Sequence, residues 1–303
     1  MIRSNARVWA TIALLVTSAA GLVAQQIPPA QNGSSSALQS PTLNPHELVR
    51  QAVANEINSS HDDVSLMFRV RRQGPKGTQT REYVETAEGT AGMLVAMNDQ
   101  PINAAQRQQE FARLDQLLRN PAELQKKQKQ QKEDSDRVTR MVKCLPDAFH
   151  YEYEGTEEVN GLKLVRLRFE PNPEFDPPSR EQQVFTGMDG FLLIEPHQAR
   201  IARIDGTLFK DVGFGWGILG HLDRGGRFVV VQAPVANGYW TTVHMRLSFT
   251  GKALFFKTIN IQTTEDSSDF RRVPGHMTYA QGVELLKKGR NGVLADNEGG
   301  GRK

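Results

Sequence analysis

The sequence predicts an exported protein of the α+β class, built on a curved antiparallel sheet with a few helices. Two observations lead to this prediction. Many short segments alternate apolar and polar residues, which is typical of strands with one buried and one wet face. The chain also begins with the pattern of a secretory signal, so the sheet is expected outside the cytoplasm.

The amino-terminal signal consists of a basic start, an apolar run and a segment of small residues. Arg3 and Arg7 come without an acidic residue, residues 8–16 are apolar, and cleavage is expected after Ala24. The apolar run is shorter than the ~20 residues that a spanning helix needs. The only cysteine, Cys144, lies far from the cleavage point, so we expect a mature protein without a lipid anchor, located in the periplasm.

Composition divides the whole chain into four parts. Residues 1–24 form the signal peptide, and 25–43 form a polar linker with almost no large apolar residue. Residues 44–288 form one domain with a helical insertion at 103–145, and the Gly-rich residues 289–303 form a tail.

The formal charge is +3, and removal of the two signal arginines leaves +1, so composition gives no support for nucleic-acid binding. A single cysteine excludes an internal disulfide, and we expect Cys144 to be buried.

Three helices are predicted within the domain. The first starts at Asn44-Pro45, where asparagine caps free N–H groups and proline fits the first turn. The second begins with the same signal at Asn120-Pro121 and follows a helical apolar pattern at 111–118. Its middle, 125–137, contains no apolar residue and includes the Lys- and Gln-rich run 125–132, so we expect it to project into water. The third helix is expected at 278–288.

About eleven strands are predicted around these helices. Three form a meander over 64–70, 81–87 and 93–97, with a Gly-Pro-Lys-Gly turn after the first. Short turns between the later segments imply antiparallel pairing of sequential strands. The later strands are expected at 149–154, 162–170, 182–186, 191–195, 201–209, 228–233, 239–249 and 254–263.

Several of these segments resemble the LolA-type periplasmic lipoprotein carriers. The turn at 155–164, the hairpin formed by 187–194 with 200–204, and the late turn at 249–255 are similar to strand turns and hairpins of that superfamily. The resemblance covers about two thirds of the chain. It implies a half-open, strongly curved antiparallel sheet, an unclosed barrel of about eleven strands lidded by helices. It also implies that the concave face holds an acyl chain of a lipid or lipoprotein.

A binding face follows from strand alternation within this fold. A curved sheet with a wet convex face must fill its concave face with side chains, helices or a ligand. The aromatic residues Phe214 and Trp216, in the Gly-rich segment 213–226, are candidates for the rim of a hydrophobic mouth. The candidate ligand-binding residues are Phe68, Val70, Val165, Leu167, Phe169, Val243, Met245, Leu247 and Phe249. If these residues form a solid core instead, the protein is an envelope interaction or sensor module.

Other chemistries find little support in the sequence. The Gly-rich segment 213–220 has no following GKS or GKT and no βαβ context, which argues against nucleotide binding. His61-Asp62-Asp63 is the nearest approach to a metal cluster but is expected to be a polar turn. GxSxG and HExxH are absent, so we expect no enzyme activity and no cofactor. The expected partner is a lipid acyl chain or lipoprotein, and the alternative interaction module would bind another envelope protein.

Overall fold

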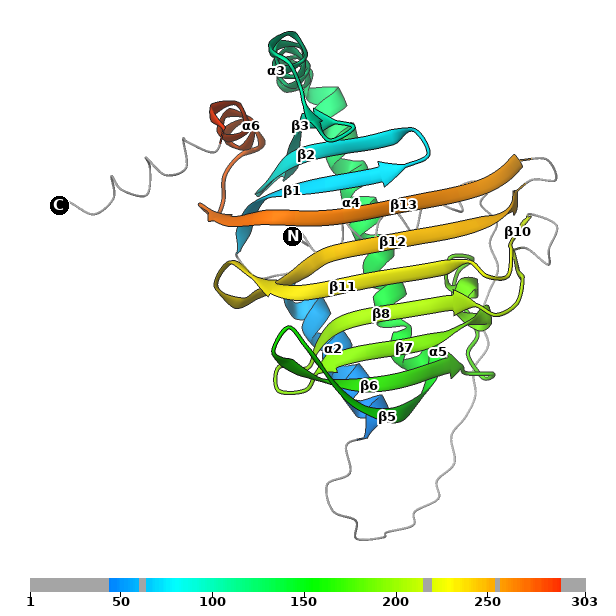
Figure 1. Ribbon diagram of the computed structural model, residues 1–303. Coiled ribbons are helices and arrows are strands. Elements are labelled where there is room, and N and C mark those ends of the chain that lie inside the picture. Colours follow the sequence, from blue (N-terminus) through cyan, green and yellow to red (C-terminus); the bar gives the residue numbers. More distant parts are fainter. Residues whose placement is uncertain (1–43, 60–63, 215–219, 254–256, 290–303) are drawn as a thin grey trace.

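The computed structural model describes residues 44–59, 64–214, 220–253 and 257–289. The chain forms a sheet whose long strands run side by side, with α2 and α4 passing behind them (Figure 1). The helices are α2 (Pro45–Ser59), α3 (Ala104–Arg119), α4 (Pro121–Lys143), α5 (Leu145–Ala148) and α6 (Tyr279–Lys288), with the short 3-10 helices η2 (Gln182–Gly187) and η3 (Ala236–Gly238). The strands are β1 (Ser65–Gly74), β2 (Gly77–Thr86), β3 (Gly89–Met97), β4 (Gln100–Pro101), β5 (Phe149–Val159), β6 (Leu162–Pro171), β7 (Met188–Glu195), β8 (Arg200–Leu208), β9 (Val212–Phe214), β10 (Gly220–Leu222), β11 (Arg227–Val235), β12 (Tyr239–Ala253) and β13 (Lys257–Val273).

The strand order explains why the sheet stays open. Its main path is β4-β3-β2-β1-β13-β12-β11-β8-β7-β6-β5, and all pairs are antiparallel. The amino-terminal meander joins the later strands through β1 and β13. Strands β4 and β5 end this path without pairing to each other. The predicted fold class, a half-open antiparallel sheet with a few helices, is confirmed.

The helix starts follow from capping. The Asn44 side chain accepts a hydrogen bond from the Glu47 N–H at 3.2 Å, and Asn120 accepts one from the Glu123 N–H at the same distance. These contacts satisfy donors that the first helical turn leaves free. The two starts predicted from asparagine and proline are therefore confirmed.

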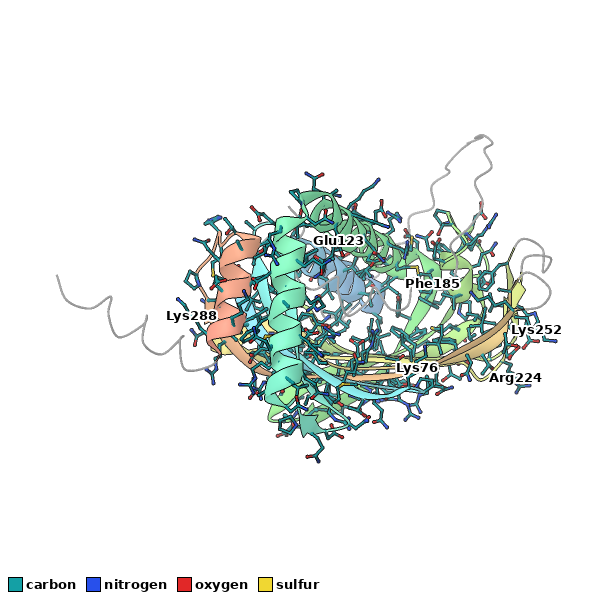
Figure 2. The ribbon with its side chains drawn as sticks, turned by 90° about the horizontal axis from the view of Figure 1, so that it is seen from above. Lys76, Glu123, Phe185, Arg224, Lys252 and Lys288 are labelled. Carbon is teal, nitrogen blue, oxygen red and sulfur yellow. The ribbon has the colours of Figure 1, made fainter. Side chains whose placement is uncertain are left out.

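Most of the concave face is filled by helices, which Figure 2 shows on one side of the sheet. The largest core cluster joins the apolar stripe of α2 and the carboxy-terminal half of α4 to the inner residues of β5–β8, β11 and β12. Leu167, Met245 and Leu247 are at most 1% exposed within it. We call this region the filled half of the concave face.

A second core lies on the opposite face of the meander. Val84 and Ala91 pack there against Val283 and Leu286 of α6, with Leu114 of α3 in the same cluster. Tyr83 is the neighbour of Val84 in β2, so its side chain points to the other, concave face. The meander is thus covered by α6 on one face and faces α4 on the other.

Three sequence predictions are corrected by the structure. The predicted strand 182–186 is the 3-10 helix η2, whose Val184 and Phe185 are both buried; an alternating strand would have buried only one of them. The Gly-rich segment 213–226 contributes to the short antiparallel pair β9 and β10. The polar middle of α4 does not project into water along its whole face, because Gln131 bonds to β3.

A β-bulge corrects the alternation predicted for 241–249. The register between β11 and β12 shifts so that Val231 lies opposite His244 and Gln232 lies opposite Thr242. Val243 is the extra residue on the bulged strand and is only partly buried, whereas Thr242 is 2% exposed. Thr242 therefore faces inward where Val243 was predicted.

Among the described helices, none is long and apolar enough to cross a membrane. The predicted signal, linker and tail, at 1–24, 25–43 and 289–303, lie almost entirely outside the described residues.

Candidate functional site

The concave face contains a cavity where the meander faces α3 and α4. Its volume is about 390 Å³, within the range of small-molecule sites. Strands β1, β2, β3, β13 and β12 form its floor, and the polar face of α4 forms its roof. It is lined by Phe68, Val70, Arg72, Gln79, Arg81, Tyr83, Thr90, Gly92, Arg113, Lys127, Gln131, Asp134, Thr241, Thr242, Glu265, Ser267 and Phe270.

Three aromatic rings form the apolar part of the floor. Phe68 stacks on Tyr83 with ring centroids 5.7 Å apart, and on Phe270 with centroids 5.5 Å apart. Phe68 and Tyr83 are a cross-strand pair of β1 and β2. Val70, two residues after Phe68 on the same face of β1, extends this apolar surface. Stacked rings offer a broad apolar surface that an acyl chain could cover.

The roof is held by polar contacts instead of apolar packing. The Thr90 N–H donates to Gln131 Oε1 at 3.2 Å, and Gln131 Nε2 donates to the Thr90 carbonyl at 3.3 Å. Lys127 Nζ donates to the hydroxyl of Tyr279 at 2.7 Å, tying α4 to α6. Gln131 thus connects α4 to β3, and Lys127 connects it to α6, through the polar ends of their side chains.

Cationic side chains surround the cavity, and most have acidic or carbonyl partners. Arg72 Nε lies 2.6 Å from Glu265 Oε1, and Arg113 Nη2 lies 2.7 Å from Glu110 Oε2 and donates to the Gly92 carbonyl at 3.0 Å. Burial raises the pKa of Glu265, an effect that the neighbouring Arg72 opposes. The cavity is therefore amphiphilic, with an aromatic part beside a charged part.

A buried polar cluster lies at the inner end of the cavity. Glu56 of α2 forms an ion pair with Arg200 of β8 at 3.3 Å, and Gln232 Nε2 donates to Glu56 at 3.2 Å. Burial raises the pKa of Glu56, although Arg200 and Gln232 act in the opposite direction. Thr242, opposite Gln232 on β12, lines the cavity, and its Oγ1 has no hydrogen-bond partner in the described part of the chain.

The structure divides the predicted ligand-binding residues into two groups. Phe68 and Val70 line the cavity. Val243 occupies the bulge and belongs to neither group. The buried members that pack in the filled half are Val165, Leu167, Phe169, Met245, Leu247 and Phe249.

Of the two predicted rim residues, the structure describes only Phe214, which does not line the cavity. Phe214 is 5% exposed and belongs to the large core cluster of the filled half. Trp216 lies outside the described residues, as does His61-Asp62-Asp63. Within the described ranges, no group of three His, Cys, Asp or Glu residues could hold a metal ion.

Sequence reasoning missed most of the cavity lining, including Arg81, Tyr83 and Phe270. In β2, Gln79, Arg81 and Tyr83 alternate with the residues that face α6, and a mostly polar set of this kind is typical of a wet strand face. The available signal was the polar middle of α4, since a helix that crosses a sheet without apolar residues leaves the sheet face beneath it unfilled.

The surface also carries a second hollow of about 480 Å³ beside the proline-rich segment 171–178. Pro171, Phe175, Phe209 and Lys210 contribute to its walls. Phe209 is 41% exposed there, with the Lys210 ammonium 5.5 Å from its ring centroid. Only the short helix η2 contributes to this hollow, through Thr186, whereas α4 covers the cavity at the meander, so the cavity under α4 is the better candidate site.

The fold and the cavity together define a class: a half-open antiparallel sheet with helices on its concave face and an amphiphilic cavity under one of them. No family model and no curated protein matches the chain. Solved structures with similar folds include a domain described as an outer membrane lipoprotein-sorting protein from Vibrio parahaemolyticus, at 13% identity and TM-score 0.30, covering 80% of this chain and 98% of that one.

Two further solved structures are similar. A DUF1329 family protein from Desulfovibrio piger is 13% identical, with TM-score 0.29 and coverage of 78% of this chain and 96% of that one. A LolA superfamily protein from Nitrosomonas europaea is 11% identical, with TM-score 0.27 and coverage of 77% and 96%. Identities and TM-scores are low, so the site described above rests on the chain's own geometry.

Proposed function

We propose that the protein is an exported, non-enzymatic binding protein that holds an acyl chain of a lipid or lipoprotein in the cavity under α4. The observation that carries this proposal is the half-open 390 Å³ space under α4 with an aromatic floor of Phe68, Tyr83 and Phe270. Removing chain methylenes from water would supply about 0.8 kcal/mol for each one buried. A carrier or sorting role in the periplasm is consistent with the predicted signal peptide.

The cavity replaces the broader concave face as the proposed binding surface. The inner residues of β5–β8, β11 and β12 already contact α2, α4 and α5, and an acyl chain there would have to displace these helices. At the meander, α4 presents Lys127, Gln131 and Asp134 instead, and a chain could enter between the floor and roof without breaking apolar packing. The part of α4 that covers the cavity is therefore held by polar contacts. Such contacts can break and form again, as the release of a ligand from a carrier requires.

A direct test is to purify the mature protein from the periplasm under native conditions and extract it with organic solvent. Mass spectrometry of the extract should find a lipid or acylated peptide in stoichiometric amount. A Phe68→Trp variant, which narrows the cavity, should carry less, while a Tyr153→Trp control on the exposed edge strand should carry the same amount. A clean extract, also after incubation with envelope lipids, would contradict the proposal.

The filled half of the concave face favours a second candidate, an envelope interaction or sensor module. Helices α2, α4 and α5 pack there with nearly complete burial, as in a fold that only displays its surface. The clean extract described above, together with capture of a specific envelope protein that requires exposed residues of α3 or α4, would support this candidate instead.

A further inference from the structure

The charged side of the cavity identifies the class of ligand more closely, if the proposed function holds. We infer that the cavity takes an amphiphile with an anionic head group, and that Arg81 binds that group. The inference rests on the position of Arg81, on the partners of the other cations, and on the aromatic rings beside it.

Arg81 lies at the centre of the cavity floor. In β2 it pairs with Val70 of β1 on one side and with Leu94 of β3 on the other. Gln79, Arg81 and Tyr83 line the cavity in succession, since alternate residues of a strand share a face. The Arg81 side chain is half-buried beneath the helical cover, so part of its hydration is already lost.

The other cations of the cavity have strong partners. Arg72 pairs with Glu265 at 2.6 Å, Arg113 pairs with Glu110 at 2.7 Å, and Lys127 donates to Tyr279 at 2.7 Å. Arg81 makes no hydrogen bond or ion pair with the residues that the structure describes.

The acids near Arg81 are themselves committed to other groups. Glu110 feels the charge of Arg81, but its oxygens accept from Arg113 and from the Leu94 N–H at 3.1 Å. Asp134 Oδ1 lies 3.3 Å from Arg137 Nη1. A guanidinium has five N–H donors, and a half-buried one without an acceptor is stabilised by an anionic oxygen. The structure therefore provides a cation without an acceptor among the described residues, which the oxygen of an anionic ligand would satisfy.

Arg81 is also next to the apolar surface. Tyr83 lies two residues along the same face of β2, which is about 7 Å in an extended strand, and it stacks on Phe68. A carboxylate or phosphate on Arg81 would therefore place the first methylenes of its chain over the rings of Tyr83, Phe68 and Phe270. This order of cation and rings fits an anionic amphiphile better than a neutral one.

The test compares ligands that share one chain and differ in the head group. Calorimetric titration of the full chain should give an affinity for palmitate and for hexadecyl phosphate at least about tenfold above that for hexadecanol, the change expected for one charge-assisted hydrogen bond. The tighter of the two anions identifies the head group as carboxylate or phosphate. Inorganic phosphate alone should bind far more weakly than either, and equal binding would overturn the amphiphile.

Variants assign the effect to Arg81. Arg81→Gln should weaken palmitate binding about 10- to 100-fold and leave hexadecanol binding unchanged, which also shows that the variant folds. Arg81→Lys should restore part of the loss. Arg246→Gln, at an exposed arginine of β12, is the matched control and should bind all ligands as the native chain does. Equal affinity of the native chain for palmitate and hexadecanol would overturn this inference alone, whereas failure of every amphiphile to bind would overturn the proposed function.

Discussion

The two halves of the concave face use the same strand pattern and reach opposite results. In the filled half, inner residues such as Leu167 and Leu247 share one apolar cluster with Val138, Met141 and Val142 of α4. In the cavity half, Phe68 and Tyr83 meet Lys127 and Gln131 of the same helix. One helix crosses both halves, so the change in its sequence marks where the core ends and the cavity begins.

The comparison shows that the helix sequence decides whether the sheet face below it is filled. Apolar side chains gain by burial and pack to the density of a protein interior. Long polar side chains keep their ends near hydrogen-bond partners, as Gln131 does at Thr90, and leave space beneath their stems. The two halves should therefore respond differently to the same kind of substitution.

The largest expected difference comes from introducing a carboxylate into each half. Leu247→Glu should cost about 4 kcal/mol or more in the free energy of unfolding, because Leu247 is 1% exposed and the new charge has no partner in the apolar cluster. Val70→Glu should cost at most about 1 kcal/mol, because Val70 lines the cavity directly opposite Arg81. Urea unfolding monitored by near-ultraviolet circular dichroism would measure both.

The same pair of variants tests the charge of the site. Val70→Glu should place a carboxylate near Arg81 and reduce palmitate binding while the protein remains folded. A folded Leu247→Glu protein, or a Val70→Glu protein that unfolds, would contradict the division into a filled half and a cavity half.

A smaller difference in stability is expected when one side chain of α4 is truncated to alanine in each half. Met141→Ala should lower the free energy of unfolding by about 2 to 5 kcal/mol, since it leaves a void in the filled half. Gln131→Ala should lower it by about 1 to 2 kcal/mol through loss of its two bonds to Thr90. Hydrogen exchange should show faster opening of the amino-terminal half of α4 in Gln131→Ala, and an equal cost for both variants would go against this account.

The smallest expected effect is a pH dependence at the boundary of the two halves. The pKa of Glu56 is raised above its usual 4.5 by burial, so the folded state holds this proton more tightly than the unfolded chain. The contribution to stability is therefore complete below pH 4.5 and is lost as the pH rises toward the raised pKa. Relative to Glu56→Gln, the native protein should lose stability across this window.

An opposite sign is expected at Asp205, which serves as the control. Burial acts to raise the pKa of Asp205, but hydrogen bonds from Arg227 and Arg203 outweigh it and hold the pKa below its usual 3.8. This carboxylate stabilises the fold above pH 3.8, and the effect is lost as the pH falls through the lowered pKa. Relative to Asp205→Asn, the native protein should gain stability as the pH rises toward 3.8, and parallel curves for the two variants would contradict both assignments.

Local sequence signals were sufficient for most of the fold. Capping residues, strand alternation and short turns predicted three of the described helices and most long strands, because each depends on neighbours in the sequence. The bulge at Val243 could not be predicted, since it appears only in the pairing of β12 with β11. The helix η2 was missed because its two adjacent buried residues, Val184 and Phe185, allow either structure without the tertiary context.

The candidate site was much less predictable. Phe68 and Val70 were correctly placed on the concave side by their alternation, but Leu167 and Leu247 have the same local pattern and are packed against helices. What separates these pairs is whether distant parts of the chain cover them with apolar side chains, as the filled half does, or with polar ones, as at the cavity. Arg81 carried no local signal, since an arginine alternating with polar residues is typical of a wet strand face.

The central claim is that an acyl chain occupies the cavity under the polar part of α4 and not the filled half. Photo-cross-linking with a palmitate analogue that carries a diazirine on its chain, followed by peptide mapping, tests this most directly. The account predicts adducts on β1, β2 and β13, at or beside Phe68, Tyr83 and Phe270, that unlabelled palmitate competes away. Competed adducts on Leu167, Leu192 or Leu247, with none in the meander, would contradict it.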